Sequence, residues 1–234
     1  FFFSSRRRHT RLLTVTGVQT CALPISKEGL YLINKSRGRS SFSIVAQVRR
    51  VSGIKKVGHA GTLDPEAEGL LIVLVGKAFT KKAEQYSKLD KSYEFTIKLG
   101  ENSTTDDAEG EKTVVSKTKP SKGEIYAVLA GLSGEITQTP PVYSAIKIGG
   151  QRAYKLARKG EKPDMPSRKV TIENFKILNY DYPLVKLSAD VSSGTYIRSL
   201  ARSIGKKLAT GAYCTQIVRT RIGQFELKDA LRID

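Results

Sequence analysis

The sequence predicts an α+β domain built on a mixed, mainly antiparallel sheet that is flanked by helices. Several segments alternate apolar and polar residues with the period of a β-strand, and others space apolar residues as on one face of a helix. The two kinds of segment follow one another without a regular strand–helix–strand rhythm, which favours a largely antiparallel sheet. A chain of 234 residues is long enough to bury one sizeable core.

Residues 1–26 differ from the rest of the chain. They carry four arginines and no acidic residue, and they precede a sharp change of pattern at Lys27. Their order of apolar and basic residues does not match a secretory signal. We expect residues 1–26 to be a non-native or disordered leader, with a targeting arm as the alternative, and residues 27–234 to form the domain.

The first helix is expected at residues 41–54, SFSIVAQVRRVSGI. Ser41 or Ser43 is its expected N-cap, because a serine hydroxyl can accept a hydrogen bond from an amide of the first turn. The apolar face of this helix is expected to hold Ile44, Val48 and Val51.

Two strands are expected next. Residues 70–76, LLIVLVG, form a short apolar run that is typical of a strand buried on both faces. Residues 91–100, KSYEFTIKLG, alternate cleanly. Tyr93 is therefore expected to point to the apolar side of its strand.

Two polar segments, residues 101–112 and residues 138–151, are expected to be loops, the second extended by its double proline. Between them, residues 122–136 fit a helix with an apolar face of Ile125, Val128, Leu129 and Leu132. A short helix within residues 150–163 would then align three cations, either as a phosphate-facing stripe or as a solvated basic face. These cations are Arg152, Lys155 and Lys159.

The last part of the domain is expected to hold two strands and a helix. Residues 168–180 and 184–194 carry strand alternation. Residues 194–208, GTYIRSLARSIGKKL, fit an amphipathic helix with Arg198 in its first turn. The inward stripe would contain Ile197, Leu200, Ala201, Ile204 and Leu208.

Composition limits the chemistry that is available to this chain. Forty Lys and Arg against 22 Asp and Glu give a net charge of +18, which indicates an anionic partner, most commonly nucleic acid. The apolar runs are too short to span a bilayer. Outside the leader the chain has one cysteine, Cys214, and one histidine, His59, which excludes a zinc site and a histidine-based triad. Chemistry must therefore use carboxylate, Tyr, Lys or Arg.

Asp64 is the candidate carboxylate. Pro65 biases Asp64 toward an extended backbone, and the apolar run that follows predicts a partly buried position. A buried carboxylate needs a cation or hydrogen-bond donors, which Arg198 could supply. The alternative is that Asp64 is an ordinary turn residue before proline.

The segment KVGHAGTLDPEAEGLL resembles the signature of the TruB family of tRNA pseudouridine synthases. Five further blocks resemble the family in its order, and together they cover nearly all of residues 27–234. The chain departs from the family pattern at Ser36, where proline is usual, and at Val218, where arginine is common. It also ends where many relatives add a PUA-type RNA-binding domain, so we expect either a short form without that domain or a truncated sequence. The five blocks are GLYLINKSRGRSSFSIVAQVRR, KSYEFTIKLGENSTTDDAEGE, QTPPVYSAIKIGGQRAYKLARKGE, SSGTYIRSLARSIGKKL and VRTRIGQFELKDAL.

The resemblance implies a pseudouridine-synthase-like domain that isomerises uridine to pseudouridine in RNA, at uridine 55 in the T-arm of tRNA. Such a reaction needs no metal and no diffusible cofactor. Asp64 would be the catalytic residue, attacking the ribose or the base or transferring a proton in the sugar, and these alternatives stay open. The target must be flipped out of its stack, because chemistry at a base cannot occur inside it.

The resemblance also implies roles for other residues. Tyr93 would pack against the target base and take part in proton transfer, and Arg198 would pair with the catalytic carboxylate. The alternatives are an ordinary core tyrosine and a surface cation. The residues expected to contact RNA or substrate are His59, Lys35, Ile217, Tyr196, Arg152 and Lys155.

We expect a cytoplasmic monomer that binds tRNA and has no metal or membrane partner. Two other functions are compatible with the sequence. One is a related synthase that acts on another RNA, with guide partners as in dyskerin-type relatives. The other is a non-catalytic RNA-binding or RNA-folding protein that keeps the same scaffold.

Overall fold

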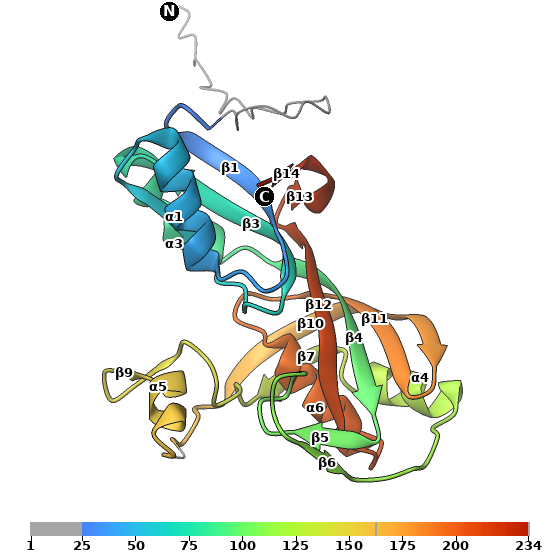
Figure 1. Ribbon diagram of the computed structural model, residues 1–234. Coiled ribbons are helices and arrows are strands. Elements are labelled where there is room, and N and C mark those ends of the chain that lie inside the picture. Colours follow the sequence, from blue (N-terminus) through green and yellow to red (C-terminus); the bar gives the residue numbers. More distant parts are fainter. Residues whose placement is uncertain (1–24, 162, 234) are drawn as a thin grey trace, which may run out of the picture.

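The computed structural model describes residues 25–161 and 163–233, and a ten-stranded sheet runs through the domain (Figure 1). Its main path, in order across the sheet, is β14 (Leu231–Arg232), β1 (Gly29–Lys35), β3 (Glu68–Val75), β12 (Ala212–Ile222), β4 (Lys91–Leu99), β11 (Leu184–Val191), β10 (Arg168–Asp181) and β7 (Gly134–Gln138). Two strands join beside this path, β2 (Val57–Ala60) on β3 and β13 (Phe225–Glu226) on β12. The β1–β14 and β3–β12 pairs are parallel and the other pairs are antiparallel. The expected α+β fold with a mixed, mainly antiparallel sheet is confirmed.

The helices and two small hairpins lie around this sheet. The helices are α1 (Ser41–Ser52), α2 (Lys77–Thr80), α3 (Ala83–Ser87), α4 (Lys122–Ala130), α5 (Ala153–Arg158), α6 (Ile197–Lys207) and the 3₁₀ turn η1 (Leu227–Asp229). The hairpins pair β5 (Glu101–Ser103) with β6 (Lys112–Val114) and β8 (Lys147–Ile148) with β9 (Gln151–Arg152). In Figure 1, β12 runs from the part that holds α1 to the part that holds α6, while α5 and β9 stand apart from the sheet.

The sheet buries apolar side chains on both faces. On one side of β3, residues of α1, β1 and β2 form a core, and on the other side residues near α3 and β13 form a second. Residues 70–75 are 0% exposed, so the expected strand buried on both faces is confirmed. The largest core lies under α4 and α6, against β4, β10, β11 and β12. Tyr93 belongs to it, as its place in the alternating strand predicted.

The expected leader lies mostly outside the described residues, which begin at Ile25. Ile25 itself is fully buried and packs in the core beneath α1. This residue of the expected leader therefore packs with the domain.

Helix α1 differs from its expected form at both ends. Its N-cap is Ser40, whose hydroxyl accepts from the Ser43 amide at 3.0 Å, so the expectation of Ser41 or Ser43 was wrong. Ser41 is instead buried, and its hydroxyl bonds the main chain of Leu63. Val51 is also exposed rather than inward, whereas Val45, which was not expected on the apolar face, packs in the core.

Some elements were not expected from the sequence. Helix α4 ends at Ala130, and residues 134–138 form β7 rather than the end of that helix. Strands β1, β2 and β12 were not predicted, and the loop expected at residues 101–112 contributes to the β5–β6 hairpin. β12 lies between β3 and β4 in the sheet, so this missed strand holds the centre of the domain.

Gly69 lies where the two parts of the sheet meet. One part, β14, β1 and β3, lies beside α1, and the other, from β12 to β7, lies beside α6. It has a φ of +104°, and a Cβ at this position would lie 2.4 Å from the carbonyl oxygen of Arg219. Here β3 pairs with β12 in parallel, Gly69 opposite Arg219. A side chain would push the strands apart, so glycine is required.

Candidate active site

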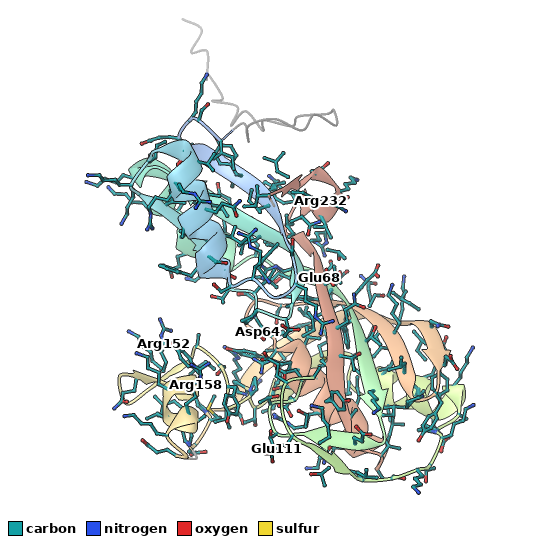
Figure 2. All side chains as sticks on the ribbon, viewed as in Figure 1. Asp64, Glu68, Glu111, Arg152, Arg158 and Arg232 are labelled. Atoms are coloured by element: carbon teal, nitrogen blue, oxygen red, sulfur yellow. The ribbon has the colours of Figure 1, made fainter. Side chains whose placement is uncertain are left out.

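A cavity of about 340 Å³ opens where the two parts of the sheet meet. Five of the residues expected in the site line it, namely Asp64, Tyr93, Tyr196, Arg198 and Ile217. Figure 2 shows Asp64 at the junction between the two parts, with Arg152 and Arg158 on the separate segment that carries α5. The fold thus gathers residues that are more than 150 positions apart in the chain into one hollow.

The segment around Asp64 is held by main-chain bonds. The Asp64 carbonyl accepts from the Ala67 amide at 3.1 Å, and the Pro65 carbonyl accepts from the Gly38 amide at 2.9 Å. Ser41 bonds both main-chain groups of Leu63. The side chain of Asp64 itself is 44% exposed, so a fixed backbone presents an accessible carboxylate.

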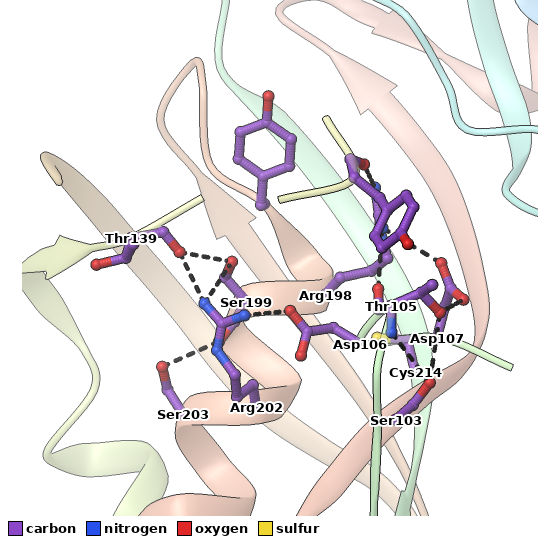
Figure 3. Close-up of polar contacts among 12 residues, drawn as sticks. Ser103, Thr105, Asp106, Asp107, Thr139, Arg198, Ser199, Arg202, Ser203 and Cys214 are labelled. Carbon is purple, nitrogen blue, oxygen red and sulfur yellow. Dashed lines mark hydrogen bonds and ion pairs between the residues drawn. The ribbon is translucent and has the colours of Figure 1, made fainter. Parts of the chain in front are cut away.

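Arg198 in the first turn of α6 pairs with that carboxylate. Its Nη2 lies 2.9 Å from Oδ2 of Asp64, and the arginine side chain is only 5% exposed. Its Nη1 lies 3.3 Å from Oδ2 of Asp107 and donates to the Thr105 carbonyl at 3.0 Å. Nη2 also donates to the Tyr143 carbonyl at 2.8 Å. A guanidinium held at several points in this way fixes the position of Asp64. Figure 3 shows Arg198 beside Thr105 and Asp107.

The second partner of Arg198 comes from residues 101–112, the first of the two expected loops. This acidic loop was not assigned to the site. Asp107 and the neighbouring Asp106 both reach α6, where Asp106 pairs closely with Arg202. Arg202 also donates to the Thr139 carbonyl at 2.9 Å (Figure 3). The sequence shows two adjacent carboxylates and, on a predicted helix, two arginines spaced four apart, but it does not show that these groups meet.

Asp106 is almost fully buried in this network. Burial raises its pKa to about 6, against the opposing effect of Arg202 and then of Arg198. Its backbone also adopts a φ of +61°. Asp106 therefore occupies a constrained position that the contact with Arg202 helps to hold.

Tyr93 and Ile217 lie on neighbouring central strands. Tyr93 is opposite Arg219, and Ile217 is opposite Phe95, in the β4–β12 pairing. Tyr93 is 8% exposed, so its ring is part of the core as well as part of the cavity wall. Tyr93 is therefore a core residue that also borders the cavity, and its contact with a target base stays a prediction.

Tyr196 lies at the N-cap of α6. The side chain of Gln138 holds its main chain at both ends, accepting from the Tyr196 amide at 2.7 Å and donating to its carbonyl at 3.1 Å. The guanidinium of Arg168 lies 4.9 Å from the ring centroid. Tyr196 is thus an aromatic wall of the cavity, backed by a cation.

Lys35, which was expected to contact RNA or substrate, lies inside the protein rather than on its surface. It is fully buried, and its ammonium donates to the carbonyls of Ser36 at 3.1 Å, Arg39 at 2.6 Å and Pro65 at 3.0 Å. Burial lowers its pKa to about 8. Through Pro65, Lys35 helps to position the segment that carries Asp64.

Three other expected contacts lie away from the cavity lining. His59 is half-buried on β2, its Nδ1 has no hydrogen-bond partner among the described residues, and burial lowers its pKa. Arg152 precedes α5 and donates to the Ala145 carbonyl, and Lys155 lies on α5. Arg152 and Lys155 are exposed and lie outside the cavity lining.

The described part of the chain has no group of three or more His, Cys, Asp and Glu side chains placed to hold a metal ion. Within that same part, every helix is too short or too polar to cross a membrane. Burial also raises the pKa of the Cys214 thiol, so it stays protonated behind the site.

The chain resembles several characterised proteins. Its fold is similar to the crystal structure of a Cbf5–Nop10–Gar1 complex, with a TM-score of 0.69 and 26% identity over 89% of this chain. This chain spans about half, 53%, of the length of that chain. This likeness shows that the sheet and its helices share the fold of the matched chain in that complex.

Sequence comparison defines the family. A model described as TruB family pseudouridylate synthase (N terminal domain) matches residues 49–197. A tRNA pseudouridine synthase B from Mycobacterium sp. (strain KMS) is 45% identical over 214 residues, 88% of this chain and 71% of the relative. One from Chlamydia pneumoniae is 38% identical over 205 residues, 88% and 87% of the two chains. The chain belongs to the TruB family of pseudouridylate synthases.

Proposed function

We propose that this chain isomerises uridine to pseudouridine in tRNA, at uridine 55 of the T-arm, and that residues 27–234 form its catalytic domain. The observation that carries the proposal is the ion pair of Asp64 and Arg198, which presents an accessible carboxylate to a cavity with an aromatic wall. Family membership and relatives named tRNA pseudouridine synthase B support both the reaction and the RNA. The cationic surface would supply affinity for the phosphate backbone.

In this reaction the bond from ribose C1′ to uracil N1 breaks and a bond from C1′ to C5 forms. The base turns while it stays in the cavity, N1 gains a proton, and the proton on C5 is released. Asp64 is the group placed to act on the nucleotide, because its carboxylate is exposed while the main chain beside it is fixed. Attack at the ribose, attack at the base and proton transfer in the sugar all use this carboxylate.

Tyr93 and Tyr196 would hold the everted nucleotide. Both rings line the cavity, and stacking on an aromatic side chain contributes roughly 1–3 kcal/mol per base. That contribution would offset part of the cost of removing the base from its stack. Arg152 and Lys155, on the exposed α5 segment, would contact the phosphate backbone outside the cavity. We further propose that the protein acts in the cytoplasm as a monomer.

Release of tritium from C5-labelled uridine in a transcribed tRNA tests this function, with Asp64→Asn as the inactive control. We expect release from tRNA with the wild-type protein and none with the variant, while both bind tRNA. Wild-type protein that binds tRNA but releases no tritium would be an RNA-binding protein instead. Release from ribosomal RNA but not from tRNA would show a synthase for another RNA.

A further inference from the structure

Two buried cations lie beside Tyr93 on the sheet. Lys91 and Tyr93 are two residues apart on β4, so their side chains leave the same face. Arg219 on β12 is directly opposite Tyr93, and paired residues on neighbouring strands project to one side. All three side chains line the cavity, so a ring and two cations share one wall.

Arg219 is 1% exposed and has no carboxylate within 4.0 Å among the described residues. Its Nε donates to the Leu70 carbonyl at 2.8 Å, and its Nη2 donates to the Gly61 carbonyl at 3.1 Å. Its Nη1 makes no hydrogen bond within the described part of the chain. The guanidinium therefore keeps both its charge and a donor at the cavity.

Lys91 is in a similar position. It is 6% exposed, and its ammonium donates to the carbonyls of Ser87, at 2.8 Å, and of Leu89. No ion pair within 4.0 Å joins it to a carboxylate in the described residues. A Cβ on Gly61 would lie 3.8 Å from Cε of Lys91 and 3.7 Å from Nη1 of Arg219, so both cations converge on one glycine.

These charges act on one another. Burial and then the charge of Arg219 lower the pKa of Lys91 to about 8, and Asp90 opposes this only in part. Arg219 also adds to the effect of burial in lowering the pKa of His59. Burying two cations without an anion is costly, and an anionic ligand between them would remove much of that cost. Arg198 cannot fill this role, because Asp64 and Asp107 already pair with it.

We propose that Lys91 and Arg219 form a subsite for a phosphodiester group of the RNA, next to the everted nucleotide that stacks on Tyr93. The subsite rests on the proposed function, since a nucleotide enters the cavity only if the target is flipped out. A phosphate accepts several charge-assisted hydrogen bonds at once, and Nη1 of Arg219 is available to donate one. The subsite would thus anchor the sugar relative to Asp64.

Arg219 also has a structural role, because its bond to Gly61 shapes the segment before Asp64. The test must therefore detect charge on the RNA rather than loss of activity alone. Synthetic T-arm hairpins would carry one uncharged methylphosphonate at a time in place of the phosphates on either side of the target uridine. Dissociation constants would be measured for wild type, Lys91→Met and Arg219→Gln. The control is Lys206→Met, which removes one exposed cation at the end of α6.

One methylphosphonate position should weaken binding to the wild-type protein about tenfold, the size expected for a charge-assisted hydrogen bond. That penalty should fall to about twofold or less in Lys91→Met and Arg219→Gln, and it should stay at about tenfold in Lys206→Met. Lys91→Arg keeps the charge and should keep the penalty, which a merely structural role would not require.

A penalty below about twofold at every position in the wild-type protein would overturn the subsite, and this measurement needs no folded variant. An equal penalty in the wild type and in both variants would overturn it as well. Pseudouridine formation on the unmodified hairpin separates the two proposals. If pseudouridine forms but no methylphosphonate penalty depends on Lys91 and Arg219, only the subsite is wrong. If such a penalty is found but no pseudouridine forms, the subsite is supported and the proposed function is wrong.

Discussion

Arg198 joins two carboxylates that lie 43 positions apart in the sequence, Asp64 and Asp107. The arginine is buried, whereas the side chain of Asp64 is nearly half exposed. Under the proposed function, the guanidinium would therefore serve as a fixed support and the carboxylate would be the group that meets the substrate. Because Asp107 takes the other edge of the guanidinium, the orientation of Asp64 depends on a residue that need not touch the RNA.

Replacement of Arg198 should therefore separate catalysis from binding. We expect Arg198→Ala to lower kcat for pseudouridine formation by about a hundredfold or more, because the carboxylate loses its support. The Kd for tRNA should change by less than about threefold, since Arg198 is bonded to protein groups rather than to phosphate. Single-turnover kinetics and filter binding measure the two quantities. A loss confined to affinity would contradict the positioning role.

At the scale of elements, two contacts bring the parts of the site together. The acidic loop between β5 and β6 reaches α6 through Asp106 and Asp107. Strand β3 meets β12 at Gly69, where the main chains come too close for any side chain. The first contact depends on charge and the second on the absence of a Cβ, so they can be tested separately.

Gly69→Ala should destabilise the domain by roughly 2–4 kcal/mol, because it adds a clash with the Arg219 main chain to the strain of a positive φ. Gly53→Ala at the end of α1 is the matched control. It has a φ of +69° but nothing within 4 Å of an added Cβ, so it should cost only about 1 kcal/mol. Urea unfolding measures both, and equal losses would show that the close approach is unimportant.

The buried carboxyl of Asp106 should make stability depend on pH. Its pKa in the folded protein, about 6, is above the ordinary value of 3.8, so between these values the folded state binds more protons than the unfolded state. The stabilisation linked to this proton is present at acidic pH and is lost as pH rises through 6.

The free energy of unfolding of the wild type, relative to Asp106→Asn, should therefore fall between about pH 4 and pH 7, by roughly 1–3 kcal/mol. Urea unfolding of both proteins across this range measures the difference. Glu109→Gln, which changes an exposed carboxylate in the same loop, is the control and should show no such step. A difference that rises with pH would mean that the pair with Arg202 outweighs burial.

At the scale of the whole molecule, the excess of positive charge and the cavity beside Asp64 would have different roles under the proposed function. Net charge of +18 attracts any polyanion, whereas the cavity accepts only a group that fits beside Asp64. Arg152 and Lys155 lie outside the cavity on the α5 segment, which stands apart from the sheet (Figure 2). Under the proposed function they would add to the general attraction for RNA rather than take part in the reaction.

Affinity for tRNA should fall steeply with salt, as expected when several phosphates are neutralised. The double variant Arg152→Gln and Lys155→Gln should reduce the slope of log K against log salt by about 1–2, while kcat at saturating RNA stays unchanged. Binding titrations at several salt concentrations measure the slope. A fall in kcat with an unchanged slope would instead place these residues in the reaction.

Local patterns determined much of the fold. Alternation in residues 91–99 and the apolar run at residues 70–75 depend on period and burial, which any stable packing of those segments must satisfy. The helix at residues 197–207, with Arg198 in its first turn, follows from spacing alone. The N-cap of α1 was missed because neighbouring serines offer the same hydroxyl. The end of α4 was missed because the segment after the helix continues into a strand. Strand β12 was missed because its alternation of apolar and polar residues is broken.

The sequence by itself determined that Asp64 is a candidate carboxylate, since proline and an apolar run constrain it locally, and that Arg198 opens a helix. Only the tertiary structure decided that Asp107 shares that arginine, that Lys35 is buried beneath the Asp64 segment, and that Arg219 faces the cavity beside Tyr93. Such contacts join segments distant along the chain, and the free energy of each depends on burial and on neighbours that no local pattern encodes.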